Sequence, residues 1–172
     1  MFTKITLENF RSFDHIELDL TEKGNTAKHL AILYGENGAG KSNLMSAFVL
    51  LPELTRTMDA RAAYERILAQ GAIFQDENME KEMREHIRQR LRDMSAIIKD
   101  YQMADCENPI IAEYEFNIDG NNGCYRVEFG QDEILHERLE FVLNRRRGLY
   151  FDCSVTGINI NDSIIEKEQG KE

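Results

Sequence analysis

Short stretches of alternating apolar and polar residues open the chain. Ile5 and Leu7 alternate with polar neighbours, and residues 16–20 repeat the pattern. A period of two predicts two strands, each with one buried face. Residues 30–34 differ, because the whole run is apolar. Such a run predicts a central strand that is covered on both faces.

Helical spacing follows in two places. Apolar residues recur at helical intervals from Leu44 to Leu51, until Pro52 stops or kinks the helix. The middle segment, roughly residues 59–103, repeats apolar residues every three or four positions: Met79, Met83, Ile87, Leu91, Met94 and Ile98. This spacing predicts an amphipathic helix whose apolar stripe docks on the protein's own core. The alternative is a stripe that faces a partner or forms a short coiled coil.

After Pro109 the pattern returns to a period of two. It predicts strands near residues 112–118, 125–129, 139–143, 149–155 and 158–160, arranged as an antiparallel meander. The segment Asp119-Gly120-Asn121-Asn122-Gly123 predicts a hairpin turn, because Gly and Asn tolerate positive φ. Ser163 and Glu166 have the spacing of a capping box, so we expect a helix to begin as the sequence stops. This ending suggests a truncated chain, a split subunit or a pseudo-complete remnant.

Composition narrows the class of protein. The chain has 172 residues, with 21 Lys and Arg against 31 Asp and Glu, giving a formal net charge of −10. This length suits one domain or one lobe, and the negative balance argues against the chain coating nucleic acid by itself. Its apolar runs are too short to span a bilayer. Three cysteines without a C-x-x-C pair indicate free thiols, so we expect a cytoplasmic protein without an export signal.

One motif carries specific chemistry. Gly35-Glu36-Asn37-Gly38-Ala39-Gly40-Lys41-Ser42 matches G-x-x-x-x-G-K-[ST], the phosphate-binding P-loop. Its glycines let the backbone approach a phosphate, and its amide groups form an anion nest at the start of a helix. Lys41 adds a mobile ammonium, and Ser42 offers a hydroxyl to Mg²⁺. The loop follows an apolar run and opens an amphipathic segment, which is the context that the motif requires.

A second sequence element, which precedes this loop, indicates a protein family. Asn9-Phe10-Arg11-Ser12-Phe13, followed by GENGAGKSNL, resembles the opening of the ABC-type ATPases of the SMC, RecF and OLD group. The resemblance is tight over residues 1–50 and loose over 110–160. It implies an α/β fold of the P-loop NTPase class: the N-terminal lobe of an ABC-type ATPase. That lobe would combine a mixed sheet and P-loop helix with a helical insertion and an antiparallel β-subdomain.

The resemblance also implies roles for individual residues. Asn37 would lie near the γ-phosphate of ATP, Lys41 would bind the β and γ oxygens, and Ser42 would bind Mg²⁺. Arg11 would touch the phosphates or brace the loop; the alternative is a surface arginine after a strand. Asn43 is typical of the family, without an assigned role. The cofactor-binding set is therefore Arg11, Gly35, Glu36, Asn37, Gly38, Ala39, Gly40, Lys41, Ser42 and Asn43.

The sequence also departs from the family. It contains no strand that ends in Asp-Glu (Walker B) and no LSGG-like signature. Asp152 follows an apolar run, but Cys153 replaces the glutamate, and the alternation there suits a meander strand. No residue is therefore assigned a catalytic role, and we expect the chain to bind nucleotide weakly and hydrolyse it poorly. Residues 144–148 form a basic turn that either is solvated or contacts a phosphate backbone or an acidic partner.

Two functional hypotheses follow. In the first, the chain is the Walker A half of an ATPase, completed by a C-terminal half and an ATP-dependent homodimer partner. Such a complex would act on DNA in repair or serve antiviral defence. In the second, it is a nucleotide-sensing module without turnover that acts with a separate subunit. The expected organisation is a P-loop core (1–58), a helical insertion (59–108), a β-meander (109–162) and the start of a helix (163–172).

Overall fold

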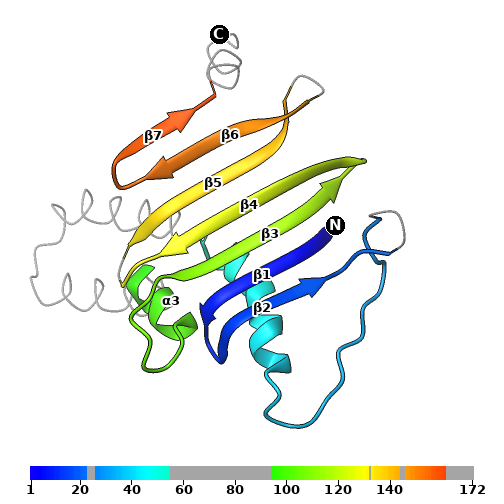
Figure 1. Ribbon diagram of the computed structural model, residues 1–172, viewed down its shortest axis with the longest axis vertical. Helices are drawn as coiled ribbons and strands as arrows, with labels where there is room; N and C mark the ends of the chain where they lie inside the picture. Colours follow the sequence, from blue (N-terminus) through cyan, green and yellow to red (C-terminus); the bar gives the residue numbers. More distant parts are fainter. Residues whose placement is uncertain (23–25, 55–93, 132, 144–145, 162–172) are drawn as a thin grey trace, which may run out of the picture.

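A seven-stranded sheet forms the framework of the chain in the computed structural model, which describes residues 1–22, 26–54, 94–131, 133–143 and 146–161 (Figure 1). The spatial order of the strands is β2-β1-β3-β4-β5-β6-β7. Their bounds are β1 Phe2–Phe10, β2 Phe13–Asp19, β3 Ile110–Ile118, β4 Asn121–Phe129, β5 Ile134–Leu143, β6 Arg146–Ser154 and β7 Gly157–Ile160. Two helices accompany the sheet: one over residues 41–54, here called the P-loop helix, and α3 (Met94–Tyr101).

The N-terminal hairpin and the meander belong to the same sheet. β1 pairs with β2 on one side and with β3 on the other, so that Ile5 lies opposite both Leu18 and Tyr114. Strands that are about a hundred residues apart in the sequence therefore lie side by side (Figure 1). This pairing places the turn after β1 close to both helices.

The meander predicted from the sequence is confirmed, since β3 to β7 pair in consecutive order. Its first turn is tighter than expected. Only Asp119 and Gly120 form the turn, with φ of 51° and 81°, and β4 already begins at Asn121. Two consecutive positive φ angles are those of a type I′ turn, whose twist matches that of the flanking strands.

The predicted central strand at residues 30–34 is wrong for this structure. The segment forms no strand, and Leu30, Ile32 and Tyr34 are 77%, 74% and 93% exposed. It belongs to a connection that runs outside the sheet from β2 to the P-loop helix (Figure 1). A run of apolar residues is buried only where other strands and helices supply its cover, and the described residues supply none.

The predicted mixed sheet is also not observed. Every strand pair among the described residues is antiparallel. The run at 30–34 was the segment from which a central strand was expected, and it remains outside the ladder. What is confirmed is an α/β fold with a large antiparallel sheet.

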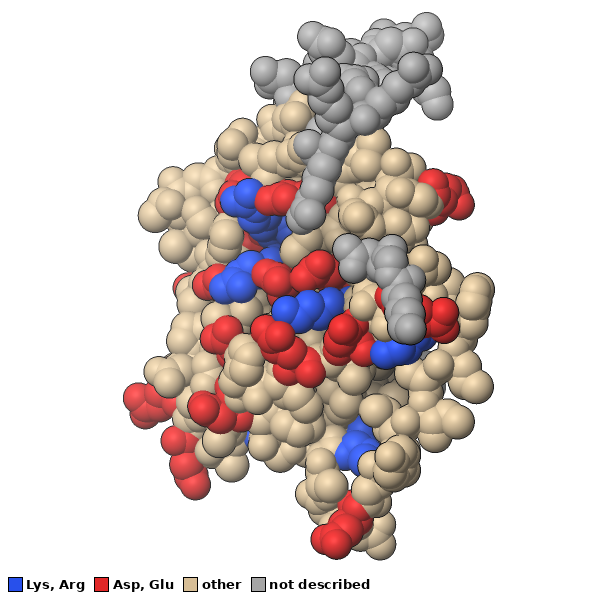
Figure 2. All heavy atoms as spheres, turned by 45° about the vertical axis from the view of Figure 1, so that its right-hand side comes forward, with Lys and Arg blue, Asp and Glu red and all other residues tan. Residues whose placement is uncertain are grey.

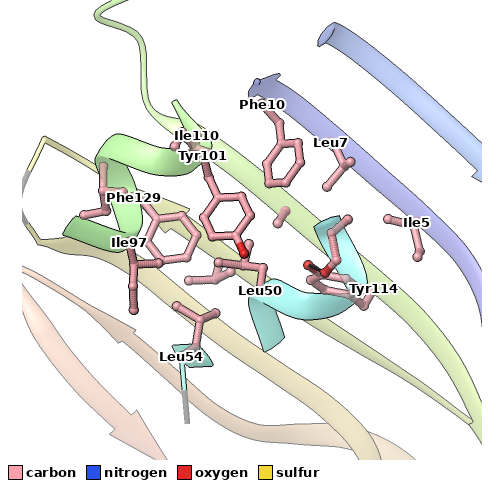
Figure 3. Packing of buried hydrophobic residues seen from close by; sticks show 14 of the residues in the cluster. Ile5, Leu7, Phe10, Leu50, Leu54, Ile97, Tyr101, Ile110, Tyr114 and Phe129 are labelled. Atoms are coloured by element: carbon pink, nitrogen blue, oxygen red, sulfur yellow. Dashed lines mark hydrogen bonds between the residues drawn. The ribbon is translucent and has the colours of Figure 1, made fainter. Parts of the chain in front are cut away.

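The core lies between one face of the sheet and the two helices (Figure 3). Fully buried residues come from β1 (Ile5, Leu7, Phe10), from the P-loop helix (Ala47, Leu50), from α3 (Ile97, Ile98) and from β3 and β4 (Tyr114, Val127). The hydroxyl of Tyr114 donates a hydrogen bond of 2.7 Å to the carbonyl of Ala47, which fixes the P-loop helix on the sheet.

Helix α3 confirms the last part of the predicted amphipathic helix. Its buried residues Ile97, Ile98 and Tyr101 share one side, as expected for a stripe that docks on the protein's own core. The rest of that prediction, over residues 55–93, lies outside the described residues, as does the capping-box segment at 163–166. Within the described chain, no helix has the length and apolar character needed to cross a membrane.

The opposite face of the sheet, here called the outer face, carries interleaved charges (Figure 2). Arg126 on β4 pairs with Glu113 on β3 and with Glu128 on its own strand. Arg138 on β5 pairs with Glu140 and with Asp152 on β6. The two faces of the sheet therefore differ sharply, and only the inner face contributes to the core.

Candidate functional site

The glycine-rich loop has the backbone geometry that a phosphate cradle needs. Gly38 and Gly40 have φ of 88° and 84°, a region in which a side chain is strained. The P-loop helix begins directly afterwards, with the amide of Leu44 donating to the carbonyl of Gly40 at 2.9 Å. The amides of the first helical turn have no acceptor within their own helix, so they are free to bind an anion.

The side chain of Lys41 folds back over the loop to which it belongs. Its Nζ donates to the carbonyl oxygens of Gly35 at 2.8 Å and Glu36 at 2.6 Å. These contacts hold the ammonium over the loop, and no carboxylate among the described residues pairs with it. Phosphate oxygens offer stronger, charge-assisted hydrogen bonds to the same group.

The structure brings the other predicted loop residues together in one exposed segment. Gly35, Glu36, Asn37, Gly38 and Ala39 are all exposed, and the amide of Ala39 donates to the carbonyl of Glu36 at 3.3 Å. Ser42 is exposed in the first turn of the helix, so its hydroxyl is accessible to a ligand.

The turn between β1 and β2 lies against the loop. The side-chain amide of Asn43 donates to Oγ of Ser12 at 2.8 Å. The ring of Phe13 lies so close to Gly40 that a Cβ there would come within 2.7 Å of a ring carbon. Residues 12 and 13 therefore brace the loop and the helix start, a role that sequence reasoning did not assign to them.

The structure places Arg11 against the end of α3. Its guanidinium carbon lies 4.8 Å from the centre of the Tyr101 ring at the end of α3, a cation–π geometry. Its backbone amide donates to the carbonyl of Tyr101 at 2.8 Å. Arg11 has φ of 53°, so the turn is held in a left-handed conformation.

The two residues before Arg11 anchor the same turn. Phe10 is fully buried and stacks on Tyr101 with ring centres 5.3 Å apart. The side-chain amide of Asn9 donates to the carbonyl of Pro109 at 2.8 Å, and the backbone carbonyl of Asn9 accepts from the amide of Met103 at 3.1 Å. All five residues of the Asn9–Phe13 element thus have a structural partner, and Tyr101 is shared by two of them.

Asp152 lies far from this arrangement in the fold. It belongs to β6 and contacts Nε2 of His136 at 2.7 Å and Arg138 at 3.1 Å on the outer face. Its interpretation as part of a meander strand is confirmed. Of the predicted basic turn, Arg146 and Arg147 lie in β6, and residues 144–145 lie outside the described part of the chain.

The outer face also contains a groove of about 470 Å³. Its lining residues are Glu113, Glu115, Cys124, Arg126, Glu128, His136, Arg138 and Glu140. Burial opposes the charge of Arg126, but its hydrogen bonds to Glu128 and Glu113 raise its pKa above the ordinary value. The carboxylates of the lining outnumber its guanidinium groups, so the charge of this groove disfavours phosphate binding.

Metal-binding clusters of three or more His, Cys, Asp or Glu residues are absent from the described residues. Cys106, Cys124 and Cys153 are free thiols, as predicted. Burial, followed by the charges of Glu137 and Asp152, raises the pKa of the Cys153 thiol. Cys153 is therefore a poor nucleophile near neutral pH.

Comparison with known proteins identifies a family. A family model described as an AAA domain matches residues 4–171. The DNA replication and repair protein RecF of Bacillus mycoides (strain KBAB4) is 41% identical over 49 residues, which cover 28% of this chain and 12% of that protein. The chain thus matches only a small part of the length of this relative. By these matches the chain belongs to the AAA domain family of nucleotide-binding ATPases, with an N-terminal region of the SMC and RecF type.

Proposed function

We propose that residues 35–43 form an ATP site and that the chain supplies the Walker A half of an ATPase. The observation that carries this proposal is the conformation of the loop. Gly38 and Gly40 have positive φ, the P-loop helix starts at residue 41, and the Lys41 ammonium lies over the loop on two backbone carbonyls. A triphosphate entering the loop would meet free amides and this ammonium together.

The residues present fit a nucleotide with Mg²⁺. Ser42 would hold the metal through its exposed hydroxyl, since Mg²⁺ prefers oxygen ligands. Asn37, exposed in the loop, would lie beside the terminal phosphate. When bound, the metal would neutralise phosphate charge. The chain's own contribution is to bind and orient the phosphates through Lys41 and the loop amides.

A second feature supports completion of the site by further protein. The apolar residues at 30–34 are exposed immediately before the loop, and Met45 and Val49 are 52% and 50% exposed on the P-loop helix. Exposed apolar surface of this kind marks a contact with another protein segment. We propose that a C-terminal half of the ATPase covers it, and that hydrolysis requires this half together with a dimer partner.

The biological role proposed for the assembled ATPase is DNA repair or antiviral defence. Repair is supported by the similarity to the RecF protein, which is named for DNA replication and repair. DNA would be contacted through the assembled complex, because the chain itself has a net charge of −10.

ATP titration tests the binding site directly. Because the chain contains no tryptophan, a fluorescent ATP analogue with Mg²⁺ gives a clean signal. Lys41→Ala removes the ammonium and should weaken binding about 10- to 100-fold, the range for lost hydrogen bonds to a charged group. Lys99→Ala is the matched control, since Lys99 is exposed on α3. Equal affinity in the two variants would contradict the phosphate cradle.

Turnover measurements test the need for a completing half. The chain alone should release phosphate from ATP at a rate close to background, because no apolar strand leads directly into an Asp-Glu pair that could position metal and water. Substantial Mg²⁺-dependent hydrolysis by this chain would refute that part of the proposal. Binding without turnover, even in the assembled protein, would favour the nucleotide-sensing alternative.

A further inference from the structure

Arg11 is bound differently from the other arginines whose side chains the structure describes. Arg126 and Arg138 each hold two carboxylates. Arg11 has no carboxylate partner among the described residues, and its buried Nε has no hydrogen-bond acceptor there. The guanidinium of Arg11 lies instead over the ring of Tyr101. Because a cation–π contact holds this guanidinium only weakly, an anionic ligand that forms hydrogen bonds with it could replace the ring.

Tyr101, whose ring faces this guanidinium, contacts the end of the P-loop helix that lies away from the loop. The hydroxyl of Tyr101 contacts Oε2 of Glu53 at 3.0 Å. Glu53 comes thirteen residues after Gly40 in the sequence, which corresponds to about 20 Å along a helix axis. The backbone of Arg11, by contrast, is tied to the loop end through its neighbours Ser12 and Phe13.

The side chain can therefore move while the turn stays in place. The backbone turn is fixed by the amide bond of Arg11 to the carbonyl of Tyr101 and by the contacts of residues 12 and 13. A partly exposed cation–π contact changes an equilibrium constant only about two- to fivefold. A phosphate oxygen pair binds a guanidinium with two charge-assisted hydrogen bonds, which are stronger.

We propose that Tyr101 is a positioning residue that holds Arg11 away from the loop in the free chain, and that phosphates in the loop draw the guanidinium off the ring. This inference rests on the proposed ATP site. It makes the end of α3 sensitive to the occupancy of the loop, because Tyr101 loses its cation when ATP binds.

Nuclear magnetic resonance of the arginine side chains tests the movement in the unmodified chain. The Nε–Hε signal of Arg11, assigned with Arg11→Lys, should be shifted upfield by the Tyr101 ring in the free protein. Saturating Mg²⁺-ATP should remove that shift. A ring-shifted signal that persists at saturation, or that is absent from the free protein, would overturn the inference.

Binding measurements provide the second test. Tyr101→Leu removes the ring and should tighten ATP binding about two- to fivefold, because the competing site for Arg11 is lost. The conservative variant Tyr101→Phe keeps the ring and should restore the wild-type affinity, although it loses the hydroxyl contact to Glu53. In an Arg11→Gln background, Tyr101→Leu should have no effect on affinity.

The outcomes separate this inference from the proposed function. Wild-type protein whose ATP binding is absent or independent of Lys41 would overturn both. Lys41-dependent binding, combined with a Tyr101→Leu effect that is equal in the wild-type and Arg11→Gln backgrounds, would overturn only the role of Tyr101. Should Tyr101→Leu fail to fold, as judged by circular dichroism, the resonance of Arg11 in the unmodified chain decides the matter.

Discussion

Two glycines of the loop allow backbone strain and steric contact to be separated by mutation. Gly38 and Gly40 have nearly the same φ, 88° and 84°. A Cβ at Gly38 would meet nothing within 4 Å, whereas one at Gly40 would lie 2.7 and 2.8 Å from the ring of Phe13 and 3.3 Å from Oγ of Ser12. Alanine at either position incurs the cost of the left-handed conformation, but only at Gly40 must a neighbour also move.

The expected magnitudes follow from these contacts. Gly38→Ala should reduce the free energy of unfolding by about 1–2 kcal/mol, the cost of a left-handed L-residue. Gly40→Ala should lose about 1–2 kcal/mol more, because the ring of Phe13, half-buried against the core, must be displaced. At about 2–4 °C per kcal/mol for a chain of this length, the melting temperatures of the two variants should differ by roughly 2–8 °C.

Thermal denaturation followed by circular dichroism measures this difference, and a double-mutant cycle assigns its cause. In a Phe13→Ala background the ring is gone, so the extra cost of Gly40→Ala should disappear and its effect should equal that of Gly38→Ala. Equal destabilisation by the two alanines in the wild-type background would refute the packing of the β1–β2 turn on the loop. An extra cost that survives without the ring would assign it to another contact.

Three further predictions concern stability and reactivity outside the loop. Tyr114→Phe removes the hydrogen bond to Ala47 and should lower the free energy of unfolding by about 1–2 kcal/mol in urea titrations. Cys153, whose pKa is raised chiefly by burial, should react with iodoacetamide at about pH 8 more slowly than in denatured protein; equal rates by mass spectrometry would contradict this. Hydrogen bonds from Thr21 lower the pKa of Asp19 below its ordinary 3.8, so its carboxylate stabilises the fold above that pH. The stability difference between wild type and Asp19→Asn should therefore vanish as acidification passes the folded-state pKa.

Local signals in the sequence predicted the loop and much of the sheet. The P-loop motif is contiguous, so its glycines and Lys41 could be placed together without knowledge of the fold. The meander was predictable for the same reason, since each turn joins neighbouring strands and Asp119-Gly120 has a strong turn preference.

Contacts between distant residues were not predictable in this way. Tyr101 stands ninety residues after Arg11, and nothing in its local pattern distinguishes it from an ordinary core tyrosine. The run at 30–34 shows the opposite error. Its composition indicates burial on both sides, but periodicity describes only the segment itself and not whether other strands are present to cover it.

The pairing of β1 with β3 has a consequence for synthesis on the ribosome. Ile5 and Leu7 find their neighbours Tyr114 and Ala112 only after about a hundred further residues have been added, which takes about 5–20 s at ordinary elongation rates. During that interval the nascent chain already carries the whole glycine-rich loop, but not strand β3 of the sheet. Until the third strand is made, the apolar residues of β1 lack these neighbours, so premature termination before it would leave an apolar hairpin open to chaperones and to aggregation.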